Sequence, residues 1–224
     1  MVLTRRVVIA GLALSGCAAV TPPLRPLTMA ASDGAQVTGQ VYGAGRRGVV
    51  LVPGGHGVGE TWHGQAERLA AAGFRVLAID YRGRGRSQGA PDDEKAHLDV
   101  LAAVRHLRES GAEQISVVGA SWGGWAAGTA AIGAPGQIER IVLLAHSPFG
   151  QPERLLGRKL FIVAAEDRIG SGRLRVEEIR EQFARVPEPK QLVILNGAAH
   201  AQFLFLTPQG ERLYSEIERF LSAP

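Results

Sequence analysis

The chain has 224 residues, which suits one domain of ordinary size with a short additional segment. Hydrophobic residues make up 46% of it and charged residues 21%, the balance of a packed globular protein, so nothing indicates global disorder. The formal net charge is +4, but the basic residues are spread along the chain, so we expect no nucleic-acid partner.

The N-terminus has the layout of an export signal. Two arginines precede an eight-residue apolar run (7–14) that is too short to span a bilayer, and small residues follow it. The segment LSGC (14–17) resembles the lipobox of bacterial lipoproteins, in which the cysteine is lipidated and becomes the new N-terminus. We therefore expect residues 1–16 to be a signal peptide. Cys17 would anchor a cell-envelope lipoprotein to the membrane, facing the periplasm; the alternative is a buried N-terminal element with an incidental cysteine.

The next segment, residues 17–33, is rich in proline, with Pro22, Pro23 and Pro26. Proline disfavours helix and favours extended chain, which suits a tether. We therefore predict a tether over 17–33 and a folded domain over 34–224.

Within the domain, short apolar runs alternate with amphipathic stretches. Strands that are apolar on both faces and alternate with helices imply a mostly parallel sheet covered on both sides. The predicted class is α/β, a doubly wound sheet in a three-layer α/β/α sandwich, with ligands bound beyond the carboxyl ends of the strands. Strands are predicted at 48–53, 74–80, 114–120, 138–146, 159–167 and 190–196, and helices at 60–74, 91–110, 121–134, 172–186 and 207–223.

A serine stands where the strand 114–120 meets the next helix, in the pattern Gly119-x-Ser121-x-Gly123. This spacing is typical of a nucleophile elbow, in which a strained turn projects the hydroxyl toward the substrate. Side chains two positions before and after the serine would collide, which explains the glycines. A serine that caps a helix is the alternative.

An activated serine needs a base, and the base needs an orienting acid. His200 follows the strand 190–196 and is the only histidine beyond Asp167 in the sequence. Asp167 lies at the end of the strand 159–167, and we prefer it to its neighbour Glu166 because of its place in the loop. Ser121, Asp167 and His200 are therefore the predicted catalytic residues.

A tetrahedral intermediate also requires two backbone N–H donors. The amide of Trp122 is the first candidate, and the glycine-rich loop 53–57 supplies the second, from Gly55 or alternatively from His56. That loop lacks the Gly-Lys-Ser/Thr ending of a phosphate-binding loop. The candidate pocket residues are His56, Trp122, Phe149 and Phe203, and core packing is the alternative for the two phenylalanines.

The domain resembles the α/β-hydrolase superfamily over residues 35–222. Besides the serine motif and the order of the three residues, Asp80–Ser87 resembles the D-x-R-G-x-G-x-S turn of that family, a structural loop. Pro53 stands where many members have a histidine. Only about a dozen residues (147–158) separate two predicted strands where relatives insert a cap. The resemblance is therefore to compact, capless, dienelactone-hydrolase-like or small-esterase-like domains with an open site.

This resemblance implies a serine hydrolase that cleaves small carboxylic esters through an acyl-enzyme. It implies neither a metal nor an organic cofactor. Two other functions stay open: a serine peptidase or amidase of the same fold, and a non-catalytic lipoprotein that uses the fold as a binding module.

Overall fold

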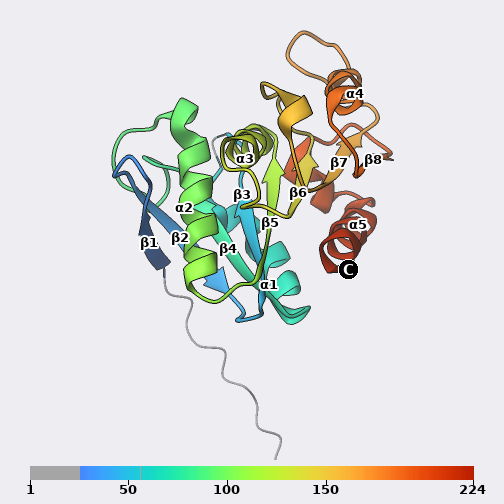
Figure 1. Cartoon of the computed structure of the whole chain (residues 1–224). Helices are drawn as coiled ribbons and strands as arrows, with labels where there is room; N and C mark the ends of the chain where they lie inside the picture. Colours follow the sequence, from blue (N-terminus) through green and yellow to red (C-terminus); the bar gives the residue numbers. More distant parts are fainter. Residues whose placement is uncertain (1–25, 56) are drawn as a thin grey trace, which may run out of the picture.

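The computed structural model describes residues 26–55 and 57–224 (Figure 1). They form one eight-stranded sheet with the order β1-β2-β4-β3-β5-β6-β7-β8. The first two strands are antiparallel to their neighbours, and the other six are parallel to one another. The strands are β1 (Pro26–Ala30), β2 (Gln36–Tyr42), β3 (Arg47–Val52), β4 (Phe74–Asp80), β5 (Gln114–Ala120), β6 (Arg140–Leu144), β7 (Arg158–Ala164) and β8 (Lys190–Leu195).

Helices cover both faces of this sheet. The chain moves one way across the sheet from β3 to β4 and the other way from β4 to β5, so right-handed crossovers put the intervening helices on opposite faces. Figure 1 shows α2 and α3 together in front of the sheet. The predicted three-layer fold class is thus confirmed. The helices are α1 (His63–Ala71), α2 (Ala96–Glu109), α3 (Trp122–Gly133), α4 (Arg175–Arg185) and α5 (Gly210–Ser222), with short 3-10 turns η1 (Gly59–Trp62), η2 (Asp93–Lys95), η3 (Pro152–Arg154) and η4 (Ala201–Leu206).

The N-terminal boundary of the domain differs from the prediction. Residues 26–33, assigned above to the tether, belong to the fold, because β1 pairs with β2 along its whole length. Pro26 begins this edge strand, a position where its missing N–H is tolerated. The folded part therefore includes Pro26, whereas the predicted signal peptide and Cys17 lie outside the described residues.

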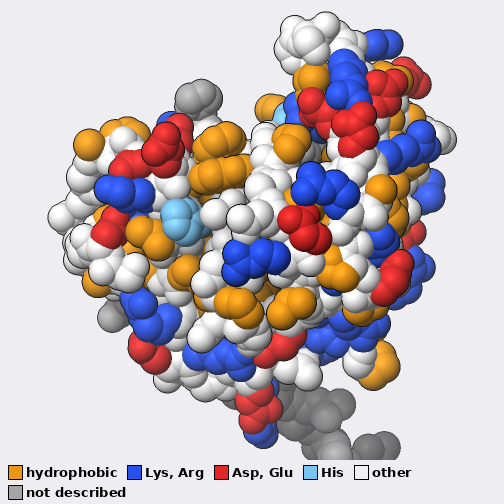
Figure 2. Space-filling view, turned by 45° about the horizontal axis from the view of Figure 1, so that its top comes forward, with side chains coloured by type: hydrophobic (Ala, Val, Ile, Leu, Met, Phe, Trp, Pro, Cys, Tyr) orange, Lys and Arg blue, Asp and Glu red, His pale blue; other side chains and the backbone are white. Residues whose placement is uncertain are grey.

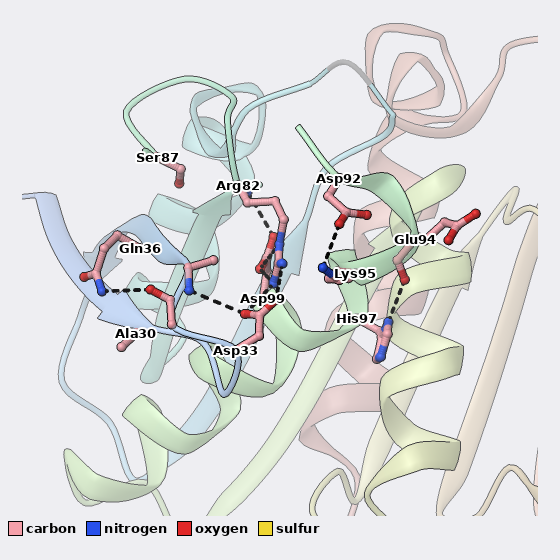
Figure 3. Close-up of polar contacts among 12 residues, drawn as sticks. Ala30, Asp33, Gln36, Arg82, Ser87, Asp92, Glu94, Lys95, His97 and Asp99 are labelled. Carbon is pink, nitrogen blue, oxygen red and sulfur yellow. Dashed lines mark hydrogen bonds and ion pairs between the residues drawn. The ribbon is translucent and has the colours of Figure 1, made fainter. Parts of the chain in front are cut away.

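A buried ion cluster joins three segments near this edge of the sheet. Figure 3 shows the Arg82 side chain pointing toward Asp99 and Asp33. The guanidinium donates to Asp99 of α2 at 2.7 and 2.9 Å and to Asp33, before β2, at 2.6 Å. Asp99 is fully buried, and it also accepts the backbone N–H of Arg82 at 2.9 Å. The cluster fixes the loop after β4 against α2 and against the turn between β1 and β2.

Among residues 26–55 and 57–224, no separate cap covers the carboxyl ends of the strands. Residues 145–157, which connect β6 to β7, contain only the short turn η3. This agrees with the capless domain that the sequence predicts. Over the described ranges, no helix is long and apolar enough to cross a membrane.

Candidate active site

Ser121 lies in a tight turn between β5 and α3, with φ of 52° and ψ of −117°. A Cβ atom on Gly119 would lie 2.4 Å from the carbonyl oxygen of Gly123. A Cβ atom on Gly123 would lie 2.4 Å from the carbonyl oxygen of Pro53. Both contacts are too short for real atoms, so the turn has the geometry predicted for the elbow, and glycine is required on both sides of the serine.

The structure brings together the three side chains that the sequence singles out. Ser121 Oγ lies 2.8 Å from Nε2 of His200, and Nδ1 of the same ring lies 2.7 Å from Oδ2 of Asp167. A carboxylate only accepts hydrogen bonds, so Nδ1 carries the ring proton and Nε2 accepts the serine hydroxyl. Asp167 is buried, whereas the competing Glu166 is exposed. A continuous path for one proton therefore runs from Ser121 to His200.

Arg175, the first residue of α4, contacts Asp167, and the sequence did not indicate this contact. Its Nε lies 3.1 Å from Oδ2 of Asp167, and its backbone N–H donates to the Asp167 carbonyl at 2.8 Å. Both side chains are largely shielded from solvent, and the two contacts fix the position of the carboxylate next to His200. One arginine among many has no distinguishing spacing, so no sequence signal could have revealed this contact.

The glycine-rich loop after β3 faces the serine from the other side. The N–H of Gly54 donates to Oε1 of Gln202 at 3.2 Å, and Nε2 of Gln202 donates to Oγ1 of Thr61 at 2.9 Å. The Gly54 amide is thus occupied, which leaves Gly55 as the preferred donor from this loop. The alternative donor, His56, lies outside the described residues.

Trp122 and Gly55 lie next to one another at this point. A Cβ atom on Gly55 would be 3.6 Å from Cβ of Trp122. Trp122 is the first residue of α3, so its backbone N–H has no acceptor within the helix. The two residues whose amides the sequence nominates therefore lie next to one another.

A cavity of about 540 Å³ opens beside Ser121 and His200. Phe203 lines it, as predicted. The Trp122 indole instead stacks on Trp125, with ring centroids 4.4 Å apart. The assignment of Phe149 to the pocket is wrong: the residue is only 4% exposed, and its ring packs against α3, where Gly128 leaves room for it. The loop after β6 turns back beneath the helix and carries this ring into the core.

His146 lies in the core behind the elbow and does not reach the cavity. Its Nε2 donates to Oε1 of Gln182, whose amide group is fixed because it also donates to the carbonyl of Phe149. Burial lowers the pKa of His146 to about 4, and the nearby positive charge of Arg175 acts in the same direction. The imidazole is therefore neutral in the folded protein at neutral pH.

This buried ring predicts a loss of stability in acid. The unfolded chain binds a proton at His146 below about pH 6.5, whereas the folded chain does so only below about 4, so stability falls across that window. The loss amounts to about 3 kcal/mol. His146→Gln keeps an N–H donor without a titratable group. Urea unfolding at pH 7 and pH 4.5 should show a smaller acid loss for the variant; equal losses would contradict the assignment.

Within residues 26–55 and 57–224, no group of three or more His, Cys, Asp or Glu side chains could hold a metal ion. The arrangement around Ser121 can perform nucleophilic catalysis with protein groups alone.

Comparison with known proteins gives one family and several relatives. The family model described as alpha/beta hydrolase fold matches residues 48–166. Bifunctional epoxide hydrolase 2 of Sus scrofa is 36% identical over 99 residues, which cover 42% of this chain and 18% of that protein. Pimeloyl-(acyl-carrier protein) methyl ester esterase of Pectobacterium atrosepticum is 32% identical over 112 residues, which cover 49% of this chain and 40% of that protein. The chain thus spans well under half the length of these relatives.

A solved structure matches over most of the chain. The esterase Pf2001 of Pyrococcus furiosus has a TM-score of 0.75 and 18% identity, with 88% of this chain and 91% of that chain covered. At this identity the likeness shows the fold alone.

Proposed function

The chain belongs to the α/β-hydrolase fold family, and from that premise we propose that it is a serine hydrolase that cleaves carboxylic esters. The observation that carries the proposal is the chain of contacts from Ser121 through His200 to Asp167, built on a strained elbow. A packing serine needs neither a positive φ nor a histidine at 2.8 Å.

In the proposed mechanism Ser121 Oγ attacks the ester carbonyl carbon while His200 Nε2 takes the hydroxyl proton. Asp167 holds the ring orientation and stabilises the imidazolium, and Arg175 holds Asp167 in position. The amides of Trp122 and Gly55 stabilise the oxyanion. His200 then protonates the departing alcohol, and water activated by the same ring hydrolyses the acyl-enzyme.

The chemistry of serine separates ester cleavage from epoxide opening, the reaction in the name of the Sus scrofa relative. A serine oxygen that opened an epoxide would become an ether oxygen, and a histidine-activated water does not cleave an ether. A serine that attacks an ester becomes an acyl ester, which water can hydrolyse. Ser121 at the nucleophile position therefore favours esters, in line with the name of the Pectobacterium relative.

A fluorophosphonate probe tests the proposed function directly. We expect it to label the purified protein on Ser121, because the probe reacts with serines that a neighbouring base activates. His200→Ala should abolish the adduct, which mass spectrometry locates. A folded protein without an adduct would refute the serine-hydrolase proposal and support a binding module. Turnover of amides rather than esters by the labelled protein would instead support a peptidase or amidase.

We further propose that the protein is anchored to the envelope membrane through a lipid on Cys17. The support is the LSGC sequence behind an apolar run. Since the fold includes Pro26, residues 17–25 would hold the domain within about 30 Å of the anchor, at about 3.5 Å for each residue. Cys17→Ala should move the protein from the membrane fraction to the soluble fraction; a variant that stays with the membrane would contradict the anchor.

No nucleic-acid partner is proposed. Figure 2 shows Lys and Arg side chains interspersed with Asp and Glu over the face in view, without a continuous basic surface. A phosphate backbone would require basic side chains gathered on one surface.

A further inference from the structure

One wall of the cavity beside Ser121 is apolar and open to solvent. Phe203 and Leu206, on η4, are 67% and 83% exposed, and both line the cavity together with Phe205. Among the described residues, three large hydrophobic side chains are strongly exposed, and two of them lie on this single turn. Large apolar groups gathered at the mouth of a site indicate contact with an apolar ligand.

The same cavity offers no partner for a charged substrate within the described residues. The lining residues that the structure describes include no Lys, Arg, Asp or Glu, and their polar side chains besides Ser121 and His200 are those of Thr61, Gln65 and Gln202. Thr61 and Gln202 already bond to each other. A carboxylate that entered the cavity would lose water without gaining a cation, which is unfavourable.

The wall is held in place before any ligand arrives. Gln202, between Ala201 and Phe203, bonds both to Gly54 and to Thr61 and so ties η4 to the glycine-rich loop. Phe205 packs edge-on against the buried Trp62, with ring centroids 5.9 Å apart. A preformed wall loses little conformational entropy on binding, so the contact can contribute to selectivity.

We propose that the site selects uncharged esters whose hydrocarbon group lies against the wall formed by Phe203, Phe205 and Leu206. The inference rests on the proposed ester hydrolysis and names its substrate class. The turn that carries the wall begins directly after His200, the proposed base, so the wall lies close enough to the reacting centre to contact either the acyl or the alcohol side of the ester.

The first test measures kcat/KM for two series of uncharged esters, one of increasing acyl chain and one of increasing alcohol chain. We expect kcat/KM to rise by about four-fold for each added CH₂ in one of the two series, since each buried CH₂ contributes about 0.8 kcal/mol. Phe203→Ala and Leu206→Ala should flatten that rise. Leu156→Ala is the matched control, an exposed apolar side chain outside the cavity, and should leave the rise unchanged.

The second test adds a charge to the substrate and then to the wall. We expect the protein to cleave an uncharged methyl ester at least ten-fold more efficiently than an ester of the same length that ends in a carboxylate. Leu206→Lys should reduce that preference by supplying a cation at the wall, whereas Leu156→Lys should not.

The outcomes separate this inference from the proposed function. Fluorophosphonate labelling of Ser121 with no chain-length rise in either series, or with wall variants that behave like wild type, would overturn the inference and leave the hydrolase intact. No labelling would refute the hydrolase itself. Wall variants that keep the rise but lose binding to phosphatidylcholine vesicles would assign the wall to a lipid surface and also overturn the inference.

Discussion

The variant Ser121→Gly is expected to be inactive and yet more stable than Ser121→Ala. Both variants remove the nucleophile and should lower kcat by about 10⁴-fold or more. They differ in the backbone, because φ of 52° with ψ of −117° is strained for any residue that carries a Cβ. Such strain destabilises the folded state by about 1–3 kcal/mol, and glycine relieves it. The greater freedom of glycine in the unfolded chain offsets about 0.5–1 kcal/mol of that relief. Ser121→Gly should therefore be more stable than Ser121→Ala by about 1 kcal/mol.

Urea unfolding of wild type and both variants measures this gain, and hydrolysis of an uncharged ester measures the activity. Ser110 provides the matched control, since it directly follows α2 as its C-terminal cap and has an ordinary φ of −81°. Glycine in place of alanine there should not stabilise the protein. If glycine at position 121 proves no more stable than alanine, the elbow is not strained. If Ser121→Ala retains ester hydrolysis, another residue is the nucleophile.

The central part of the fold could be predicted from the sequence because its parallel strands are buried on both faces. The run 114–120 is mostly apolar, without the strict polar-apolar alternation of a half-exposed strand, and it stands between two helical patterns, so a buried strand could be predicted there. The edge strands β1 and β2 could not be identified in this way. β2, with the sequence QVTGQVY, mixes polar and apolar residues, and Pro26 in β1 indicated a tether, although proline is tolerated at the start of an edge strand.

The three residues of the candidate site could be located for a similar reason. Each follows a strand, and parallel strands end at the same edge of the sheet, so chain order and position suffice. The contacts of Arg175 and Gln202 could not be located in this way, because they join segments that only the complete fold brings together. Gln202, for example, accepts the Gly54 N–H from a residue 148 positions away in the sequence. Phe149 also follows a strand, and only the path of its loop shows that the ring enters the core.

The largest effect on stability is expected at Asp99. This carboxylate is fully buried and accepts three hydrogen bonds from Arg82, from Nε, Nη2 and the backbone N–H. Asp99→Ala would leave a buried guanidinium with only the partly exposed Asp33 as a partner. Removal of one member of a buried ion pair costs about 3–5 kcal/mol, a large share of the stability of an ordinary domain.

Two further variants separate the ion pair from simple packing. Asp33→Ala removes the more exposed partner of the same guanidinium, so its loss of stability should be smaller. Arg82→Met combined with Asp99→Leu removes both buried charges and should recover much of the loss, because neither charge is then left unpaired. Urea unfolding of the set gives the coupling energy. A double variant as unstable as Asp99→Ala would show that shape, rather than charge, holds this corner of the fold.

The same variants distinguish residues that stabilise the fold from residues that carry out the reaction. Asp99 does not line the cavity beside Ser121, so the molecules of Asp99→Ala that remain folded should hydrolyse esters at the wild-type rate per labelled Ser121. Ser121→Gly should show the reverse, a stable protein without turnover. If Asp99→Ala instead lowers the rate per labelled Ser121, the Arg82 cluster also influences the geometry of the glycine-rich loop. Asp80 would connect the two, because it lies two residues before Arg82 and accepts the N–H of Gly59, just beyond that loop, at 2.7 Å.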